Sequence, residues 1–381
     1  LSPALDPTTE FGKLARVHLT QGAVRNWPVR DPAGRVAPCS HTPQATPVLL
    51  GTLAASDRLA IVDPDARTPV LDVVTVGRAP WGVAATAETA FVATAEGLAV
   101  VDLASRERTA LVPYLHGAQL PPPGSDGFGE YRDGGLGIAL SPDGTRAYVA
   151  VHRWPDPAWL EVFDVEQGAF TGSAEVGVRP FDVLADPEGE WVATVDHDSY
   201  TVSLVDTATL AVDQVEIAPF GNFGFAGWEK PHYAALTDDG RIALPYQGLV
   251  MVLLDPATGE TQRVEASANS HQHGVATAPD GRLVSAGTGP FGKATGGPNV
   301  SFLDPSDGDE VVVPLARPHE TVAIWQPDAD DDWEAVLAGG FTRDGWWDGL
   351  TLVDPAGSIR EVPLEGRPQH VVSATLPAIA P

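Results

Sequence analysis

The sequence has little cysteine, little lysine and no long hydrophobic segment. Its 381 residues include one cysteine, Cys39, so no disulfide can form within the chain. The longest apolar run, residues 248–254, has the length of a strand, and we expect no membrane insertion. Lysine occurs only at Lys13, Lys230 and Lys293, and the net charge is −28. Such a surface repels a phosphate backbone, so we expect no nucleic-acid binding.

Glycine and proline are abundant instead, with 39 and 35 residues. Both interrupt helices, which argues against a helical bundle and predicts frequent turns. Hydrophobic residues make up 43% of the chain, enough for a packed core. The chain starts at Leu1 rather than methionine, so we expect a removed signal peptide and a periplasmic or secreted protein.

A repeated pattern predicts the architecture. Each unit has an inner strand, a tight turn such as Ser141–Gly144, a second strand, and an apolar third strand that commonly ends in Asp. A four-stranded unit cannot bury both faces alone, whereas seven units around a ring can. We therefore predict an all-β, seven-bladed β-propeller of four-stranded antiparallel blades. Seven positions, 41 to 55 residues apart, align at the start of the inner strands and are called the inner column here: Trp81, Leu136, Phe181, His232, His273, His319 and Gln369.

The last unit is split between the two ends of the chain. Its inner strand, residues 369–374, lacks partners nearby, and matching strands occur at residues 47–53, 59–62 and 70–76. N- and C-terminal strands should therefore close the ring within one blade. We predict a propeller over residues 46–381 and an N-terminal extension, residues 1–45, that packs on it or is partly mobile. From Pro47 onward the repeated pattern of strands and turns resembles that of the YVTN-type seven-bladed propellers. This resemblance implies a fold and says little about function.

Histidines carry the main functional signal. Long loops are predicted on one face of the ring, and eight of the ten histidines map to that face. His232, His273 and His319 belong to the inner column, and His370 lies one residue later in its blade. Imidazoles from four consecutive blades would meet at the mouth of the central channel and bind a divalent metal. The predicted secondary participants are Glu320 and Asp182 as oxygen ligands or anchors of the ligands, and His271, His197, Cys39 and His41 as separate points of metal capture.

Two inner-strand segments add a second resemblance. The sequences His273-Gly274-Val275-Ala276 and His370-Val371-Val372 look like those of periplasmic zinc metallochaperone propellers of the AztD type. The resemblance implies an exported protein, expected to be a monomer, that binds zinc and delivers it to the solute-binding protein of a zinc importer. Copper and iron are the alternative metals. The chain lacks the His/Asp-rich N-terminal segment that such proteins carry.

Two other functions remain open at the level of the sequence. Carotenoid-cleaving oxygenases also hold iron with four histidines on a seven-bladed propeller, so an iron or copper oxygenase, or a lyase, on the same face is one alternative. The other is a non-catalytic propeller whose aromatic loops recognise a protein or a glycan. We favour a binding protein over an enzyme, and the sequence identifies no catalytic residue.

Overall fold

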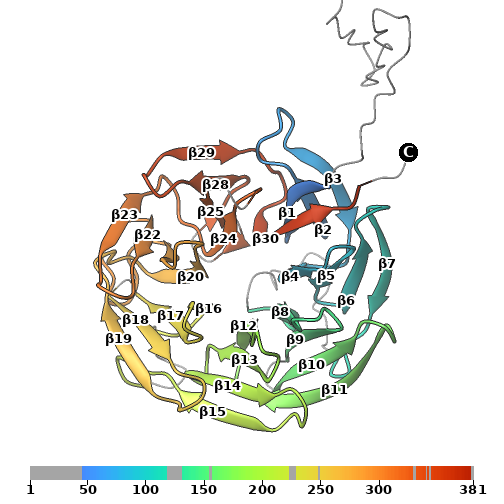
Figure 1. Cartoon of the computed structure of the whole chain (residues 1–381), viewed down its shortest axis with the longest axis horizontal. Helices are drawn as coiled ribbons and strands as arrows, with labels where there is room; N and C mark the ends of the chain where they lie inside the picture. Colours follow the sequence, from blue (N-terminus) through green and yellow to red (C-terminus); the bar gives the residue numbers. More distant parts are fainter. Residues whose placement is uncertain are drawn as a thin grey trace, which may run out of the picture. The chain divides into compact units, whose positions relative to one another are not determined.

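Seven four-stranded antiparallel sheets surround a central axis (Figure 1). The predicted all-β, seven-bladed propeller is thereby confirmed. The computed structural model describes residues 45–117, 131–153, 157–222, 229–247, 249–328, 332–339, 341–342 and 345–378. Within these ranges, no helix is long and apolar enough to cross a membrane. Nearly all of the predicted N-terminal extension, with Cys39 and His41, lies outside the described residues.

The blades follow the order of the chain, each from the inner strand outward. Blade 1 comprises β4 (Val83–Ala85), β5 (Thr89–Ala93), β6 (Leu98–Asp102) and β7 (Glu107–Val112). Blade 2 comprises β8 (Gly134–Leu140), β9 (Arg146–His152), β10 (Ala158–Asp164) and β11 (Ala169–Val176). Blade 3 comprises β12 (Pro180–Ala185), β13 (Trp191–Asp196), β14 (Thr201–Asp206) and β15 (Val212–Glu216).

The next three blades repeat this order. Blade 4 comprises β16 (Ala235–Leu236), β17 (Ile242–Tyr246), β18 (Val250–Leu254) and β19 (Thr261–Glu265). Blade 5 comprises β20 (Gln272–Thr277), β21 (Leu283–Gly287), β22 (Asn299–Leu303) and β23 (Glu310–Pro314). Blade 6 comprises β24 (Thr321–Trp325), β25 (Glu334–Ala338), β28 (Leu350–Val353) and β29 (Ile359–Val362), and a short hairpin of β26 (Phe341–Thr342) and β27 (Gly345–Trp346) interrupts it.

The closing blade joins the two ends of the described chain, as predicted. The C-terminal β30 (Pro368–Leu376) pairs with β1 (Thr46–Leu53), and Leu50 lies opposite Val372. The outer strands β2 (Arg58–Val62) and β3 (Val70–Thr75) complete the sheet. Backbone hydrogen bonds between β1 and β30 tie the N-terminal strands to the C-terminal strand and so close the ring.

The core lies between the faces of neighbouring blades. Leu50 and Ile61 of the closing blade belong to one cluster with Val92 and Val101 of blade 1, and all four are fully buried. The middle strands are covered on both faces, which explains continuous apolar runs such as that of β18, where every residue is buried. Burial of these runs between blades is what makes the ring a single folded unit.

The inner strands approach one another closely where the inner column begins. A Cβ atom on Gly274 would lie 2.5 Å from the carbonyl oxygen of Glu320 on the next blade, and one on Gly82 would lie 2.5 Å from the carbonyl oxygen of Leu136. Only glycine permits this approach of two backbones. In β8, β12 and β20 the pairing register also shifts at the column position, as in a β-bulge. The column therefore lies where neighbouring inner strands approach closely and their pairing is irregular; we call this level of the channel the neck.

Candidate metal centre

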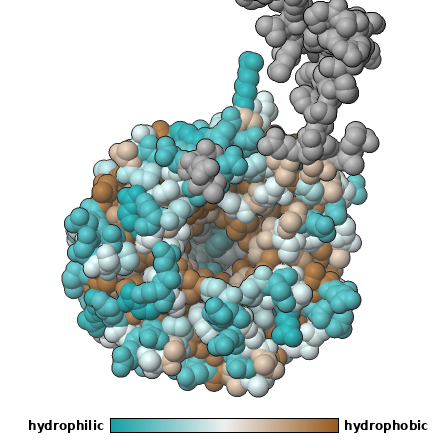
Figure 2. Space-filling view, in the orientation of Figure 1, coloured by the Kyte–Doolittle hydropathy of each residue, from teal (hydrophilic) through white to brown (hydrophobic). Residues whose placement is uncertain are grey.

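The inner column lines the neck with two kinds of side chain. All seven members are buried, with exposed fractions from 0 to 2%. Trp81, Leu136 and Phe181 form an apolar arc with Tyr233. His232, His273, His319 and Gln369 form the polar arc of the remaining blades. Figure 2 shows the hollow at the centre of the ring from one face.

Three histidines meet within the polar arc. The nitrogen atoms that His232, His271 and His273 offer all lie within 4.8 Å of one another, and each residue is at most 2% exposed. The rings of His232 and His273 are stacked with centroids 4.0 Å apart, and Nε2 of His273 lies 3.0 Å from Nδ1 of His271. We call these residues the three-histidine cluster. Three imidazoles at such spacing can hold one divalent ion and leave a fourth coordination position open.

His271 was expected as a separate capture point, and the structure instead places it in the cluster. Its backbone is fixed by the end of β21: the His271 amide donates to the carbonyl of Gly289 at 2.8 Å, and the amide of Thr288 donates to the carbonyl of His271 at 2.9 Å. Phe291 lies against the ring with centroids 4.9 Å apart. Residues two apart along an extended chain project to the same side, so His271 and His273 can reach one ion.

Glu320 stands behind the cluster. It is fully buried, and its Oε1 lies 3.8 Å from Nδ1 of His273. The other ring nitrogen of His273 faces His271, so the carboxylate lies on the side of the ring away from that partner. A carboxylate in this place orients a ligating imidazole and compensates the charge of an ion. The anchoring role predicted for Glu320 fits this position better than direct ligation.

His319 and His370 lie outside the cluster. Nε2 of His319 is 3.0 Å from Oγ1 of Thr351, and the ring of His370 lies between Trp81 and Tyr233 with centroid distances of 5.9 and 5.2 Å. Burial lowers the pKa of His319 to about 4 and that of His370 to about 3, so both are neutral at physiological pH. The structure thus brings together His232 and His273, two of the four histidines predicted as ligands. It adds His271, which was predicted as a separate point of metal capture.

Asp182 has a structural position between two blades. Its Oδ2 accepts a hydrogen bond from the amide of Ala234 at 3.0 Å, and its Oδ1 accepts one from the amide of Val183 at 2.9 Å. Burial raises the pKa of Asp182 to about 6. These contacts tie β12 to the segment that carries His232, so Asp182 helps to position the cluster.

A buried ionic network adjoins the cluster. Asp198 interacts with Nδ1 of His197 at 2.9 Å, Nζ of Lys230 at 2.5 Å and Nη1 of Arg179 at 2.7 Å. Although burial opposes it, the hydrogen bond to His197 and the ammonium of Lys230 hold the pKa of Asp198 well below its usual range. Burial lowers the pKa of His197 to about 4, so its imidazole is neutral at physiological pH.

The backbone explains how these side chains converge. The amides of His197 and Asp198, directly after β13, donate to the carbonyls of Arg179 and Val178, directly before β12. Sequence reasoning missed this network. Two signals were present: His197 is flanked by two aspartates, and Lys230, one of three lysines in the chain, stands two residues before His232.

The other described histidines of the predicted face lie apart from the three-histidine cluster. His152 is fully buried, and its Nε2 lies 3.4 Å from Nε of Arg179. The ring of His116 is stacked on Trp159 with centroids 3.8 Å apart, and its Nδ1 lies 3.1 Å from Glu161. Neither residue shares a metal-binding set with other ligands among the described residues.

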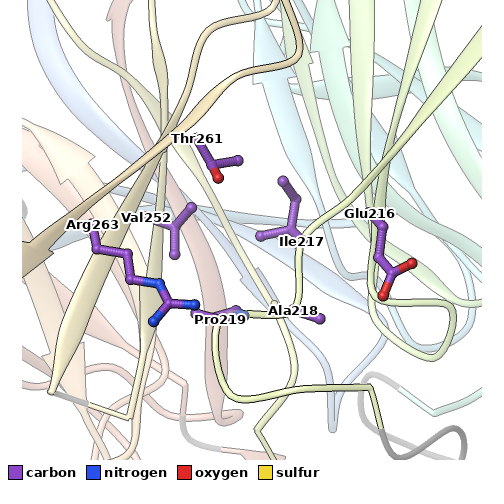
Figure 3. Close-up of a pocket in the computed structure, with 7 residues that line it drawn as sticks. All are labelled: Glu216, Ile217, Ala218, Pro219, Val252, Thr261 and Arg263. Atoms are coloured by element: carbon purple, nitrogen blue, oxygen red, sulfur yellow. The ribbon is translucent and has the colours of Figure 1, made fainter.

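A separate groove lies between blades 3 and 4 (Figure 3). It has a volume of about 200 Å³, and none of its lining residues is a histidine. Its charged members are Glu216 and Arg263. The groove offers no set of metal ligands, so it does not compete with the channel as the metal centre.

Comparisons with known proteins show a similarity in fold. No protein-family model matches the chain, and a search of curated proteins found no match. A solved protein of unknown function from Desulfotomaculum acetoxidans DSM 771 is similar in structure, with a TM-score of 0.61, 10% identity, and coverage of 86% of this chain and 98% of that chain.

Two proteins of known name are also similar. A catalytically inactive histidine-to-alanine variant of virginiamycin B lyase from Staphylococcus aureus, with quinupristin, has a TM-score of 0.54 and 12% identity over 84% of this chain and 89% of that chain. Hydrazine synthase from Kuenenia stuttgartiensis has a TM-score of 0.52 and 16% identity over 72% of this chain and 76% of that chain. The chain is a seven-bladed propeller resembling those of the lyase and the synthase. At these identities the likeness concerns the fold alone.

Proposed function

We propose that this protein is an exported zinc-binding propeller that carries the ion in its central channel and hands it to a partner. The single observation that carries the proposal is the buried cluster of His232, His271 and His273. Imidazole nitrogen is a preferred ligand of Zn²⁺, and it also suits copper and iron. The resemblance of two inner-strand segments to zinc metallochaperones favours zinc, and it favours the solute-binding protein of a zinc importer as the acceptor.

The surroundings of the cluster support binding over catalysis. The rings are almost completely buried, and Glu320 supplies a compensating carboxylate directly behind His273. An ion held there is shielded from water, which suits retention until an acceptor arrives. His197, the nearest additional imidazole, has a pKa of about 4 and would be a weak general base at neutral pH.

Metal analysis of the protein without a histidine tag tests the proposal. We expect about one equivalent of zinc per chain after loading, as for a single structural or transport site. His273→Ala should abolish this uptake, whereas His116→Ala should leave it unchanged because His116 stacks on Trp159 outside the cluster. Uptake below about half an equivalent, with no response to added zinc or copper, would contradict metal binding and leave the recognition propeller as the alternative.

A metal-dependent lyase is the second candidate. The observation in its favour is that three protein ligands leave one coordination position open, as in catalytic zinc sites. An iron oxygenase with four histidine ligands is less well supported, because His319 and His370 lie outside the cluster. Spectroscopy of the cobalt-substituted protein distinguishes carrier from lyase: a spectrum that changes readily with added anions indicates an open position accessible to a substrate, and a spectrum that added anions leave unchanged indicates an ion shielded as in a carrier.

A further inference from the structure

His197 lies next to the three-histidine cluster without belonging to it. The ring centroids of His197 and His232 are 4.6 Å apart. This separation falls between those that His232 has within the cluster, 4.0 Å to His273 and 5.7 Å to His271. His197 is thus as near to His232 as the members of the cluster are, but its nitrogen atoms are not within reach of all of them at once.

The side chain is prepared for ligation through one defined atom. Asp198 is ionised between Lys230 and Arg179, and an ionised carboxylate can only accept hydrogen bonds. Nδ1 of His197, 2.9 Å from Asp198, therefore carries the proton, and Nε2 has the free lone pair. This is the arrangement by which a carboxylate orients a metal-bound histidine.

A series of ring contacts leads from the exposed Tyr131 to the cluster. Tyr131 is 41% exposed, and its ring contacts that of His197 edge-on with centroids 5.8 Å apart. His197 is 4% exposed and His232 is 2% exposed, and His273 stacks behind His232. An ion that moves along these contacts from Tyr131 toward the cluster would meet His197 before His232 and His273.

We propose that His197 and His232 form a second metal station through which a divalent ion of the zinc class enters and leaves the three-histidine cluster. This inference rests on the proposed function. His232 belongs to both sets, so an ion can gain a bond to Nε2 of His197 as it loses the bonds to His271 and His273. The exchange involves neutral imidazoles and needs no oxidant, no reductant and no proton transfer. Asp198 fixes His197, and Lys230 and Arg179 keep Asp198 from moving to the ion.

Rates of loading and release test the station. His197→Phe keeps an aromatic ring against Tyr131 and Phe181 and removes the ligand atom. We expect it to slow both zinc loading and zinc release to a chelator by about tenfold or more, while the dissociation constant changes by less than about threefold, because a station on the path acts equally in both directions. His116→Ala is the matched control and should leave both rates unchanged.

The outcomes separate the station from its alternatives. Unchanged rates would mean that His197 only packs against His232. A dissociation constant raised by about tenfold or more, with faster release, would make His197 a resident fourth ligand. Either result overturns the proposal. If His197→Phe does not fold, cobalt loading of the unaltered protein decides: the station predicts a transient absorption spectrum before the final one, and a single phase overturns it. Failure of the proposed function appears differently, as no metal uptake by the unaltered protein.

Discussion

His232 and His273 lie face to face, with 4.0 Å between ring centroids and 22° between ring planes, although they belong to adjacent blades. Neither blade could present this pair alone. The cluster with His271 is built on this contact between blades 4 and 5.

The membership of the cluster gives the first prediction. His271→Ala should lower bound zinc to less than about one tenth of the unaltered level, because it removes one of three ligands. His370→Ala should leave the stoichiometry unchanged, because His370 packs between Trp81 and Tyr233. Metal content by mass spectrometry measures both. The reverse pattern would support the ligand set predicted from the sequence.

The position of Glu320 gives the second prediction. Glu320→Gln keeps the shape of the side chain but removes the charge behind His273, so zinc affinity should fall by about 10- to 100-fold with the stoichiometry retained. Competition titration with a chelator measures the change. Glu361→Gln, on the outer strand of the same blade, is the control, since that side chain is half exposed. An equal loss in both variants would mean that the effect is not specific to Glu320.

The close contact at Gly274 gives the third prediction. An added methyl group would meet the backbone of Glu320 at 2.5 Å, so Gly274→Ala should lower the free energy of unfolding by about 1–3 kcal/mol and displace His273. Gly297→Ala, with open space around the glycine, should change it by less than about 0.5 kcal/mol. Urea unfolding of the metal-free protein compares them. Equal stability of the two variants would show that the neck can relax.

The buried histidines give the fourth prediction, which concerns acid. A histidine whose pKa is lowered by folding stabilises the protein fully above its unfolded pKa of about 6.5 and loses this contribution as the pH falls toward the folded value. Burial gives folded pKa values of about 4 for His152, His197 and His319, and about 3 for His370. The metal-free protein should therefore become less stable as the pH falls from about 6.5 to about 4.

Two buried carboxyl groups oppose this trend. Burial raises the pKa of Asp182 and Asp196 to about 6, so their protonation favours the folded state as the pH falls below that value. Near pH 5, unfolding lets the four histidines take up about four protons and makes the two carboxyl groups release about two. The net uptake on unfolding is therefore about two protons. Urea midpoints across this range measure the slope, and His370→Gln should reduce it because it removes one of the four buried histidines. Greater stability at the lower pH would contradict the prediction.

Much of the fold could be predicted because a propeller repeats its local signals. Turns such as Ser141–Gly144 and the apolar strands recur in the sequence, and the unpaired strand before the C-terminus required partners near the start. The pairing of β30 with β1 confirms that argument. Repetition also placed His232 and His273 in one column, which the structure retains.

The ligand set could be predicted only in part. Alignment along the repeat treats the seven inner strands as equivalent, but their starts are irregular. His319 shares the column with His273, yet its Nε2 faces Thr351 within its own blade. Lys230 and Asp198 are 32 residues apart and meet through a side-chain contact that no repeat encodes.

The sequence by itself determined the ring, its seven blades, its closure and the arc of blades that carries histidine, since these follow from local turns, strand periodicity and a recurring unit. Tertiary structure alone decided which imidazoles face one another. That choice depends on backbone approach and ring rotation at the neck, where the register shifts of β8, β12 and β20 change the direction of the side chains on those strands.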